Sequence, residues 1–323
     1  MLLQTYPALR SRDLAAIGAA FKLKAFAGAR DDMSVDRADG EFVYKAVNFR
    51  QAGLAFVSYD SSVTLEFQPS RDILIAYQLR EVSEVLVDGE VIENGVVHPG
   101  CLIPSGQGWS VQNPNGYEVL MLRVEAATLR RKLSALLGTE NVRLDLRQPR
   151  AAGIGRALIR ESVLTFAKEL DMVDRRFLPS LVVNSVEEIC LGILTSLSEQ
   201  YLEAERTPPA ASAAQLERVE QYILAHYGRP LIVEALAEIS GVSARSVLHH
   251  FLSRHGCSLY DYLARVRLTM AQATLPAHRD EASVAAVALK CGFPSLNQFV
   301  QAYRHRFGEA PTRPLGERPP GMH

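Results

Sequence analysis

The sequence has few of the residues that build disulfide-linked, metal-binding or membrane proteins. Its 323 residues include only 4 cysteines, and these are far apart without CxxC spacing, so neither a disulfide framework nor a zinc site is expected. No apolar run approaches the ~20 residues of a membrane span. Arg10, Arg12 and Asp13 interrupt the N-terminal stretch that a signal peptide would need. We therefore expect a soluble cytoplasmic protein.

An excess of one charge is also lacking, since the formal net charge is -1. A content of 48% hydrophobic and 22% charged residues is ordinary for a globular protein, and the length favours two domains. The charge is unevenly divided, because residues 213–323 hold 12 Lys and Arg against 9 Asp and Glu. Seven of the eight histidines also lie in this region. The asymmetry permits a polyanionic partner without establishing one.

The first part of the chain predicts strands followed by helices. Short segments rich in β-branched and aromatic residues, separated by turn residues, indicate an antiparallel barrel or sandwich. These segments are 42–49, 53–59, 62–67, 73–79, 83–87 and 118–124. Helices are then predicted over 127–137, 157–170 and 177–203. The fold class expected for the whole chain is α+β.

An apolar stripe at helical spacing marks the third of these helices. Either the stripe packs inside the chain, which we favour, or it forms a dimer seam. Its members are Val182, Val186, Ile189, Ile193 and Leu197.

A segment with two prolines and several small residues, 204–214, is the clearest domain boundary. It predicts a domain over 1–203, a short tether, and a second, all-helical domain over 215–323.

One pattern occurs twice in the second domain. A small residue is followed by a glycine, an apolar residue and a serine, and the frame repeats after the serine. From Ser243 and from Ser295, an aromatic residue follows at eight positions, an arginine at eleven and a glycine at thirteen. The second turn is one residue longer because of Pro294.

Each position of this pattern has a physical reason. The glycines Gly241 and Gly292 can end a helix in the left-handed conformation, and the serines can cap the helix that follows. Apolar pairs four residues apart then place one face of that helix on the core. These pairs are Val247 with Phe251 and Phe299 with Tyr303. Two helix-turn-helix motifs are predicted.

The opposite faces of the two exposed helices carry side chains that can read base edges. Arginine can pair with guanine, and Asn or Gln with adenine. The first face holds Arg245, Ser246, His249 and His250, and the second holds Asn297, Gln298, Gln301 and Arg304. A long helix over 259–275, carrying Arg265 and Arg267, would hold both readers at a fixed separation for successive major grooves. Double-stranded DNA is the expected partner.

Residues 215–311 resemble the AraC/XylS family of bacterial regulators. The segments that carry the resemblance are LAEISGVSARSVLHHF, RVRL at 265–268 and VALKCGFPSLNQFVQAYRHRFGEAP. The resemblance implies base contacts from Arg245, Leu248, His249, Asn297, Gln298 and Gln301. We expect phosphate contacts from Arg229, Ser243, Arg254, Ser295, Arg304 and Arg306. The sequence departs from the family at His249, often Arg, at Ile232, usually a Ser or Thr cap, and after Pro311, where a shortened final helix is expected.

Residues 20–200 are similar, more weakly, to the cupin-like sensor domain of the XylS-like branch. The turn His98-Pro99-Gly100-Cys101-Leu102-Ile103-Pro104 supports this. Members of the branch often sense aromatic or other catabolic compounds and activate nearby operons. The resemblance implies an effector-binding, dimeric activator that contacts RNA polymerase and needs no cofactor.

A ligand pocket inside a small barrel is plausible on physical grounds. The residues predicted to line it are Lys45, Tyr59, Tyr77 and Trp109, with Lys45 available to a carboxylate.

Two other functions stay open: a ligand-independent architectural or interaction protein using the same DNA module, and a cupin-type enzyme fused to it. Catalysis is disfavoured. Residues 1–212 contain one histidine and no HxH pair, and neither a G-x-S-x-G elbow nor a P-loop is present.

Overall fold

The computed structural model describes residues 2–12, 40–60, 63–67, 69–80, 84–87, 89–94, 100–113, 117–146, 154–204, 207–275 and 281–311. The chain divides into two compact units. The first unit is Met1–Leu133, Asn141–Met172 and Ser185–Ala204. The second unit is Ser134–Glu140, Val173–Asn184 and Glu205–His323. The sequence predicted one break near residue 204, whereas the structure also assigns two short earlier segments to the second unit.

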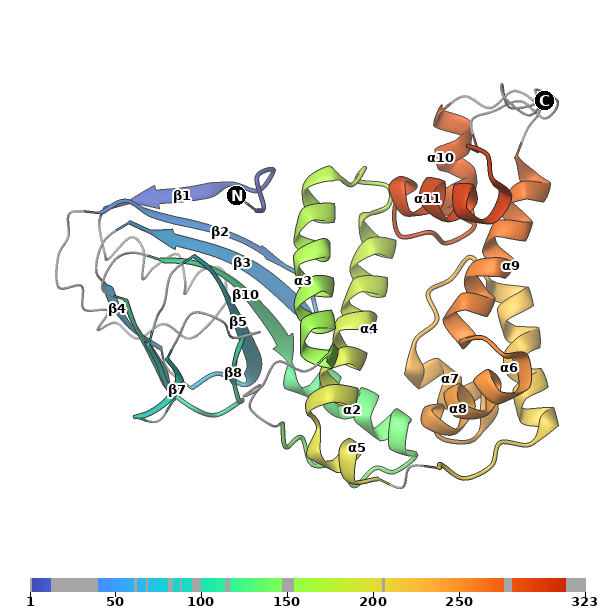
Figure 1. Ribbon diagram of the computed structural model, residues 1–323, viewed down its shortest axis with the longest axis horizontal. Helices are drawn as coiled ribbons and strands as arrows, with labels where there is room; N and C mark the ends of the chain where they lie inside the picture. Colours follow the sequence, from blue (N-terminus) through green and yellow to red (C-terminus); the bar gives the residue numbers. More distant parts are fainter. Residues whose placement is uncertain are drawn as a thin grey trace. The chain divides into compact units, whose positions relative to one another are not determined.

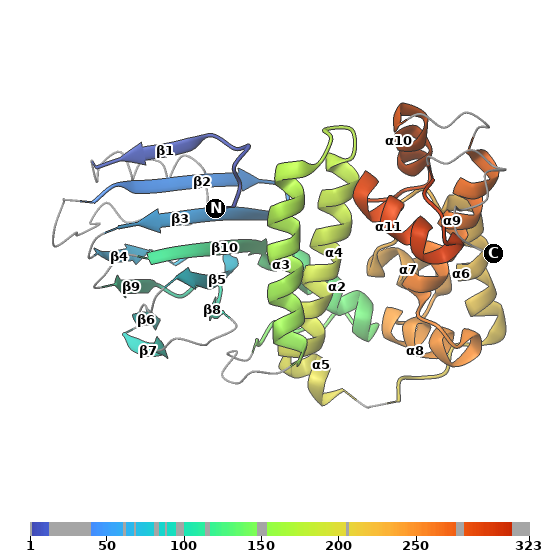
Figure 2. The same ribbon diagram turned by 45° about the horizontal axis from the view of Figure 1, so that its top comes forward.

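Two antiparallel sheets form the first unit (Figures 1 and 2). The six-stranded sheet has the order β1-β2-β3-β10-β5-β8, and the four-stranded sheet has the order β4-β9-β6-β7. The strands are β1 Ala8–Ser11, β2 Phe42–Asn48, β3 Ala52–Tyr59, β4 Val63–Phe67, β5 Asp72–Arg80, β6 Glu84–Val87, β7 Glu90–Asn94, β8 Cys101–Ile103, β9 Trp109–Asn113 and β10 Tyr117–Glu125.

An apolar cluster fills the space between the two sheets. Side chains alternate along a strand, so every second residue faces this cluster. On β10, Val119 and Met121 belong to the cluster, while the intervening Leu120 is fully buried on the other face. The rings of Phe67 and Trp109 stack with centroids 3.9 Å apart. The predicted sandwich and the α+β class are confirmed.

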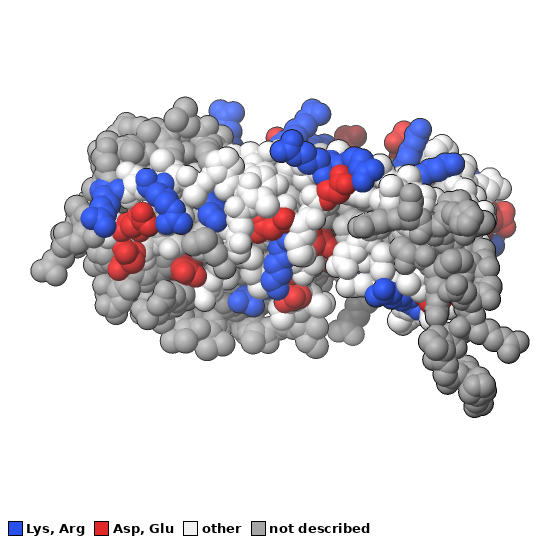
Figure 3. Space-filling model, turned by 90° about the horizontal axis from the view of Figure 1, so that it is seen from above, with Lys and Arg blue, Asp and Glu red and all other residues white. Residues whose placement is uncertain are grey.

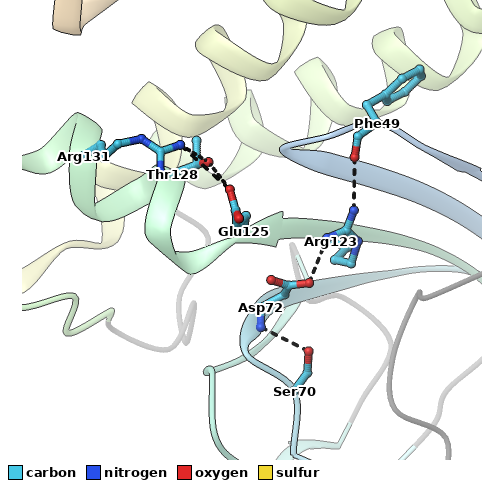
Figure 4. A network of polar contacts seen from close by, with 7 residues as sticks. All are labelled: Phe49, Ser70, Asp72, Arg123, Glu125, Thr128 and Arg131. Carbon is cyan, nitrogen blue, oxygen red and sulfur yellow. Dashed lines mark hydrogen bonds and ion pairs between the residues drawn. The ribbon is translucent and has the colours of Figure 1, made fainter.

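Polar contacts hold the end of β10, where it runs into the first described helix (Figure 4). The Arg123 guanidinium donates to Asp72 at 2.8 Å and to the Phe49 carbonyl at 3.3 Å. Thr128 donates to Glu125 at 2.8 Å, one turn into that helix. The strand and the helix are therefore joined through hydrogen-bonded side chains as well as through the backbone.

Four helices follow the sandwich: α2 Ala126–Leu137, α3 Ile154–Met172, α4 Leu178–Leu197 and α5 Glu199–Glu203. Val186, Ile189, Ile193 and Leu197 of the predicted stripe are buried within the chain, and Val182 is half-buried. The interpretation of the stripe as intramolecular packing is confirmed for these residues.

Helix α4 is also long and apolar enough to cross a membrane by length and composition, a feature that the sequence analysis did not anticipate. Its Glu187 carboxylate is buried and ion-paired with Lys132 of α2, also buried. An acidic residue paired inside the fold and an apolar stripe covered by the rest of the chain are typical of a core helix.

The described part of the second unit is helical apart from its turns. Its helices are α6 Ala213–His226, α7 Val233–Ser240, α8 Ala244–His255, α9 Leu259–Thr274, α10 Glu281–Lys290 and α11 Leu296–Phe307. Ser212 caps α6 in a reciprocal capping box with Gln215, so this helix begins two residues before the predicted position. Phe177, which precedes α4, is buried in the same apolar cluster as Ala271 and Tyr303.

Candidate functional site

The first repeat folds as a helix-turn-helix formed by α7 and α8. Helix α7 ends at Gly241, which has a φ of 71°, and the Gly241 N–H donates to the Ala237 carbonyl. The Ser243 hydroxyl then accepts from the Ser246 N–H at 3.1 Å, and α8 ends at Gly256 with a φ of 66°. The predicted caps are confirmed. Helix α7 begins after Ile232 without a side-chain cap, as that residue type requires.

The second repeat, formed by α10 and α11, uses the same devices. Gly292 follows α10 with a φ of 79°, and Phe293 is buried in the turn. The Ser295 hydroxyl accepts from the Gln298 N–H at 3.2 Å. Helix α11 ends at Gly308 with a φ of 75°. The extra Pro294 therefore lengthens the turn without changing the cap.

The predicted apolar pairs turn one face of each exposed helix inward. Val247 and Phe251 on α8, and Phe299 and Tyr303 on α11, are all fully buried. Because residues four apart share a helical face, the polar residues between them lie on the other side. Each helix thus has a core face and a polar face, as the repeat predicts, but Ser246, expected on the polar face of α8, is buried beside Ser243.

The proposed base-contacting residues lie on these polar faces with different exposure. His249 is exposed on α8, where Arg245 and Leu248 are half-buried. On α11, Asn297 and Gln301 are exposed, and the Gln301 amide donates to the Asn297 amide oxygen at 3.4 Å. Gln298 is half-buried. Asn297 and Gln301 present adjacent amides of the type that pairs with adenine.

The residues predicted to contact phosphates fall into three groups. Arg229, Arg304 and Arg306 are exposed, and no ion pair holds them within the described residues. Arg254 is held 3.5 Å from both Glu217 and Glu220 of α6. The hydroxyls of Ser243 and Ser295 already accept hydrogen bonds as helix caps, and Ser295 is buried.

Basic and acidic side chains are interspersed over the described part of the face in Figure 3. This agrees with the near-neutral net charge. Attraction to a polyanion would therefore come from local groups of cations, such as the last turn of α11, rather than from the field of the whole molecule.

A small cavity lies inside the β-sandwich of the first unit. Its walls are apolar except for Gln78, and they come from both sheets. The lining residues are Phe67, Ala76, Gln78, Val85, Trp109, Val111, Val119 and Met121. The Trp109 indole N–H is buried and has no acceptor among the described residues, although a buried donor ordinarily has one.

Of the four residues predicted to line an effector pocket, Trp109 lines this cavity, and Lys45, Tyr59 and Tyr77 are not part of its lining. Tyr77 lies between Ala76 and Gln78, both of which line the cavity, so its side chain is on the opposite face of β5. Lys45 lies between two residues of the inter-sheet cluster on β2 and is likewise on the other face. Tyr59 faces the cluster but does not reach the cavity.

The apolar lining could not be identified from residue type alone. Predicting it requires the register of β5, β9 and β10, since a shift of one residue exchanges the two faces of a strand. Phe67 and Met121 carried no polar signal that would single them out.

No group of three or more His, Cys, Asp or Glu residues able to hold a metal ion occurs in the described part of the chain. None of the four cysteines forms a disulfide. His98, part of the cupin-type turn, lies outside the described residues, as does the tail after Pro311.

Two family models match the chain. One describes an AraC-binding-like domain and matches residues 32–195, and the other describes a helix-turn-helix domain and matches residues 236–315. The first alone covers half of the chain. The chain belongs to the AraC family of transcriptional regulators.

Several curated proteins are similar to this family member. The transcriptional activator RhaR of Pectobacterium atrosepticum is 28% identical over 153 residues, 47% of this chain and 53% of RhaR. The XylDLEGF operon transcriptional activator of Pseudomonas putida is 33% identical over 133 residues, 40% of this chain and 41% of that protein. The chain thus spans about half the length of these relatives.

Solved structures include a probable AraC family transcriptional regulator from Rhodopseudomonas palustris. It is 36% identical and covers 31% of this chain and 93% of that chain, with a TM-score of 0.29.

Proposed function

We propose that this protein is a cytoplasmic, ligand-responsive transcriptional activator that binds double-stranded DNA through α8 and α11 and has no enzymatic activity. The observation that carries the proposal is the repeated frame: two capped helices, each with a buried apolar face and a polar outer face. The two relatives named above are described as transcriptional activators, which supports the direction of regulation. The XylDLEGF operon activator also supports an operon as the target, and the family resemblance implies that this operon is catabolic.

In this proposal, α8 and α11 enter successive major grooves on one side of the duplex, about one helical turn or ~34 Å apart. Arg245, Leu248 and His249 read one groove, and Asn297, Gln298 and Gln301 read the other. Arg229, Arg254, Arg304 and Arg306 contact phosphates and set the register. The protein acts as a homodimer and contacts RNA polymerase.

The test of DNA reading begins by selecting preferred duplexes from a random pool with the full chain. Arg245→Ala and Gln301→Ala should each lose roughly 1–3 kcal/mol of base discrimination, at positions about one duplex turn apart. Gln272→Ala, on an exposed position of α9, is the matched control for Gln301 and should leave the preferences unchanged. Loss of discrimination at a single shared position would contradict two-groove reading.

The effector in this proposal binds between the two sheets at this cavity, whose free volume of about 20 Å³ must widen to admit a molecule larger than water. The apolar walls favour a small, largely apolar molecule, and the buried Trp109 N–H favours one that carries a hydrogen-bond acceptor such as a carbonyl or carboxylate. Val119 and Met121 of the lining belong to β10, which runs directly into α2 and is bonded to it through Thr128 and Glu125. A ligand that moves β10 would therefore act on α2.

The test of the effector site is a thermal-shift screen of small aromatic and aliphatic acids, esters and ketones against the full chain. For any compound that binds, Trp109→Phe keeps an aromatic ring but removes the donor, and affinity should fall roughly 2- to 10-fold. Tyr77→Phe changes a residue on the face of β5 that points away from the cavity. This variant is the control and should bind the compound with unchanged affinity. If Tyr77→Phe weakens binding and Trp109→Phe does not, the cavity is not the site.

The same experiments separate the alternatives. A ligand-independent architectural protein would select DNA but bind no compound in the screen, and its DNA affinity would be the same with and without the library. A cupin-type enzyme would carry bound metal in elemental analysis and turn over a compound rather than only bind it.

A further inference from the structure

The strongest unexplained feature outside the proposed reader faces is a buried arginine in the connecting helix. Arg267, in the middle of α9, is 6% exposed. Its Nε donates to the Tyr227 carbonyl at 2.8 Å, and its Nη2 donates to the Arg229 carbonyl at 2.9 Å. Tyr227 is the C-cap of α6, where helix carbonyls lack partners within the helix. One guanidinium thus ties the end of α6 to α9.

The same turn after α6 also meets the second motif, backbone against backbone. A Cβ at Gly228 would lie 2.5 Å from the Lys290 carbonyl oxygen, and a Cβ at Gly292 would lie 2.6 Å from the Gly228 carbonyl oxygen. Real Cβ atoms essentially never approach so closely. Only a pair of glycines allows the α6–α7 turn and the α10–α11 turn to touch in this way.

Three parts of the second unit therefore meet at Arg267. Helix α6 packs against α7 and α8 of the first motif, and α9 packs against α8, α10 and α11. The turn at Lys290–Gly292 belongs to the second motif. The turn that leads into the first motif thus touches the turn inside the second motif, at Gly228 and Gly292.

The chemistry around Arg267 indicates that its side chain restrains the relative orientation of α6 and α9. Among the described residues, the guanidinium donates to two carbonyls and pairs with no carboxylate. Burial lowers the pKa of Arg267 to about 10, so the group stays charged at neutral pH. Burying a cation without an ion partner costs desolvation energy. A planar fork that donates to two carbonyls from fixed directions restrains orientation better than an ammonium group can.

We propose that Arg267 and the Gly228–Gly292 contact are the elements that hold α8 and α11 at one separation and angle, and so determine the spacing between the two DNA elements that the protein accepts. Arg267 is a positioning residue in this scheme and touches no base. The inference rests on the proposed DNA-reading function and adds to it the source of spacing specificity.

The experiment measures spacing preference directly. Duplexes selected by the full-length protein are resynthesised with both recognition elements intact and the segment between them changed by -1, 0, +1 or +2 base pairs. Each base pair moves one element by ~3.4 Å and rotates it out of register, so the unaltered protein should lose roughly tenfold affinity per shifted base pair. Arg265→Met, two residues away and exposed, is the matched control and should behave the same.

Arg267→Met should reduce the difference between spacings to roughly threefold or less, while base preferences within each element stay unchanged. Arg267→Lys, which keeps the charge but loses the fork, should lie between. A role in stability alone would lower affinity for every duplex equally and leave the ratios between spacings intact. Ratios equal to those of the unaltered protein in Arg267→Met would overturn the inference.

Two further measurements separate a folding defect and a failure to select DNA from the outcomes above. If circular dichroism shows that Arg267→Met does not fold, the same ratios are read from Arg267→Lys and Gly228→Ala, and unchanged ratios in both overturn the inference. If the unaltered protein selects no sequence from the random pool, it is the proposed function that fails, a result distinct from selection with unchanged spacing ratios.

Discussion

The two helix-turn-helix motifs share one frame but differ in how their cations are held. Both exposed helices have a serine cap, a buried apolar face and a glycine in the left-handed region at the end. In the last turn of α8, Arg254 lies 3.5 Å from Glu217 and from Glu220, and His255 contacts Glu220 at 2.9 Å. In the last turn of α11, Arg304 and Arg306 are exposed and have no acidic partner among the described residues.

The backbone conformation of each motif and the electrostatic environment of its cations therefore have different origins. The frame depends on local caps and on residues four apart, which both copies keep. Whether a cation at the end of the helix is neutralised depends on a neighbouring helix, since α6 packs against α8 and supplies two glutamates. We therefore expect the second motif to provide more of the attraction to phosphates.

The largest expected effect tests whether the two motifs form one folding unit. Phe299→Ala and Phe251→Ala each remove a fully buried ring and should each lower the free energy of unfolding by roughly 3–5 kcal/mol. Because α9 packs against both motifs, both variants should shift the same transition in urea, followed by circular dichroism. Leu252→Ala, at an exposed position of α8, should stay within about 0.5 kcal/mol. Two separate unfolding transitions, one for each motif, would contradict the expectation that the motifs unfold together.

The next effect concerns the unequal cations. Each phosphate contact contributes about 0.9 to the slope of log affinity against log salt, so Arg304→Ala with Arg306→Ala should reduce that slope by about 1.8. Arg254→Ala should reduce it by less, because in the free protein its charge is already shared with two glutamates. Fluorescence anisotropy at several salt concentrations measures both. An equal loss per arginine would show that the ion pairs of α6 have no bearing on DNA binding.

The smallest effect compares the two caps. Ser243→Ala and Ser295→Ala each remove a hydroxyl that accepts a helix N–H, and each should cost about 1 kcal/mol of stability. Ser253→Ala, at an exposed position in the last turn of α8, is the control and should cost less than about 0.5 kcal/mol, because its hydroxyl only donates to the His249 carbonyl. Chemical denaturation resolves these differences. If a cap variant loses no more stability than Ser253→Ala, the hydrogen bond of that cap contributes nothing measurable to the free energy of unfolding.

Much of the second unit could be predicted from the sequence, and less of the first. The glycine ends, serine caps and apolar pairs of both motifs were predicted, because each depends on residues within about one helical turn. In the sandwich, six strands were predicted, whereas β1, β7, β8 and β9 were not. All four are five residues or shorter in length. Strands so short show little alternation before they pair.

The single helix predicted over 177–203 is also divided in the structure. Ser198 is buried and caps α5, so α4 ends at Leu197. The apolar period runs through this point without a glycine or proline, and the sequence pattern therefore contained no stop signal.

The order of residues along the chain was enough to establish two similar motifs and their capping, since those features depend on side chains and backbone groups that are neighbours in sequence. Only when distant segments came together was it decided which faces of β5 and β10 line the cavity, and which carbonyls accept hydrogen bonds from the Arg267 guanidinium. Strand register and the approach of Gly228 to Gly292 depend on packing between elements far apart in the chain, and no local spacing records them.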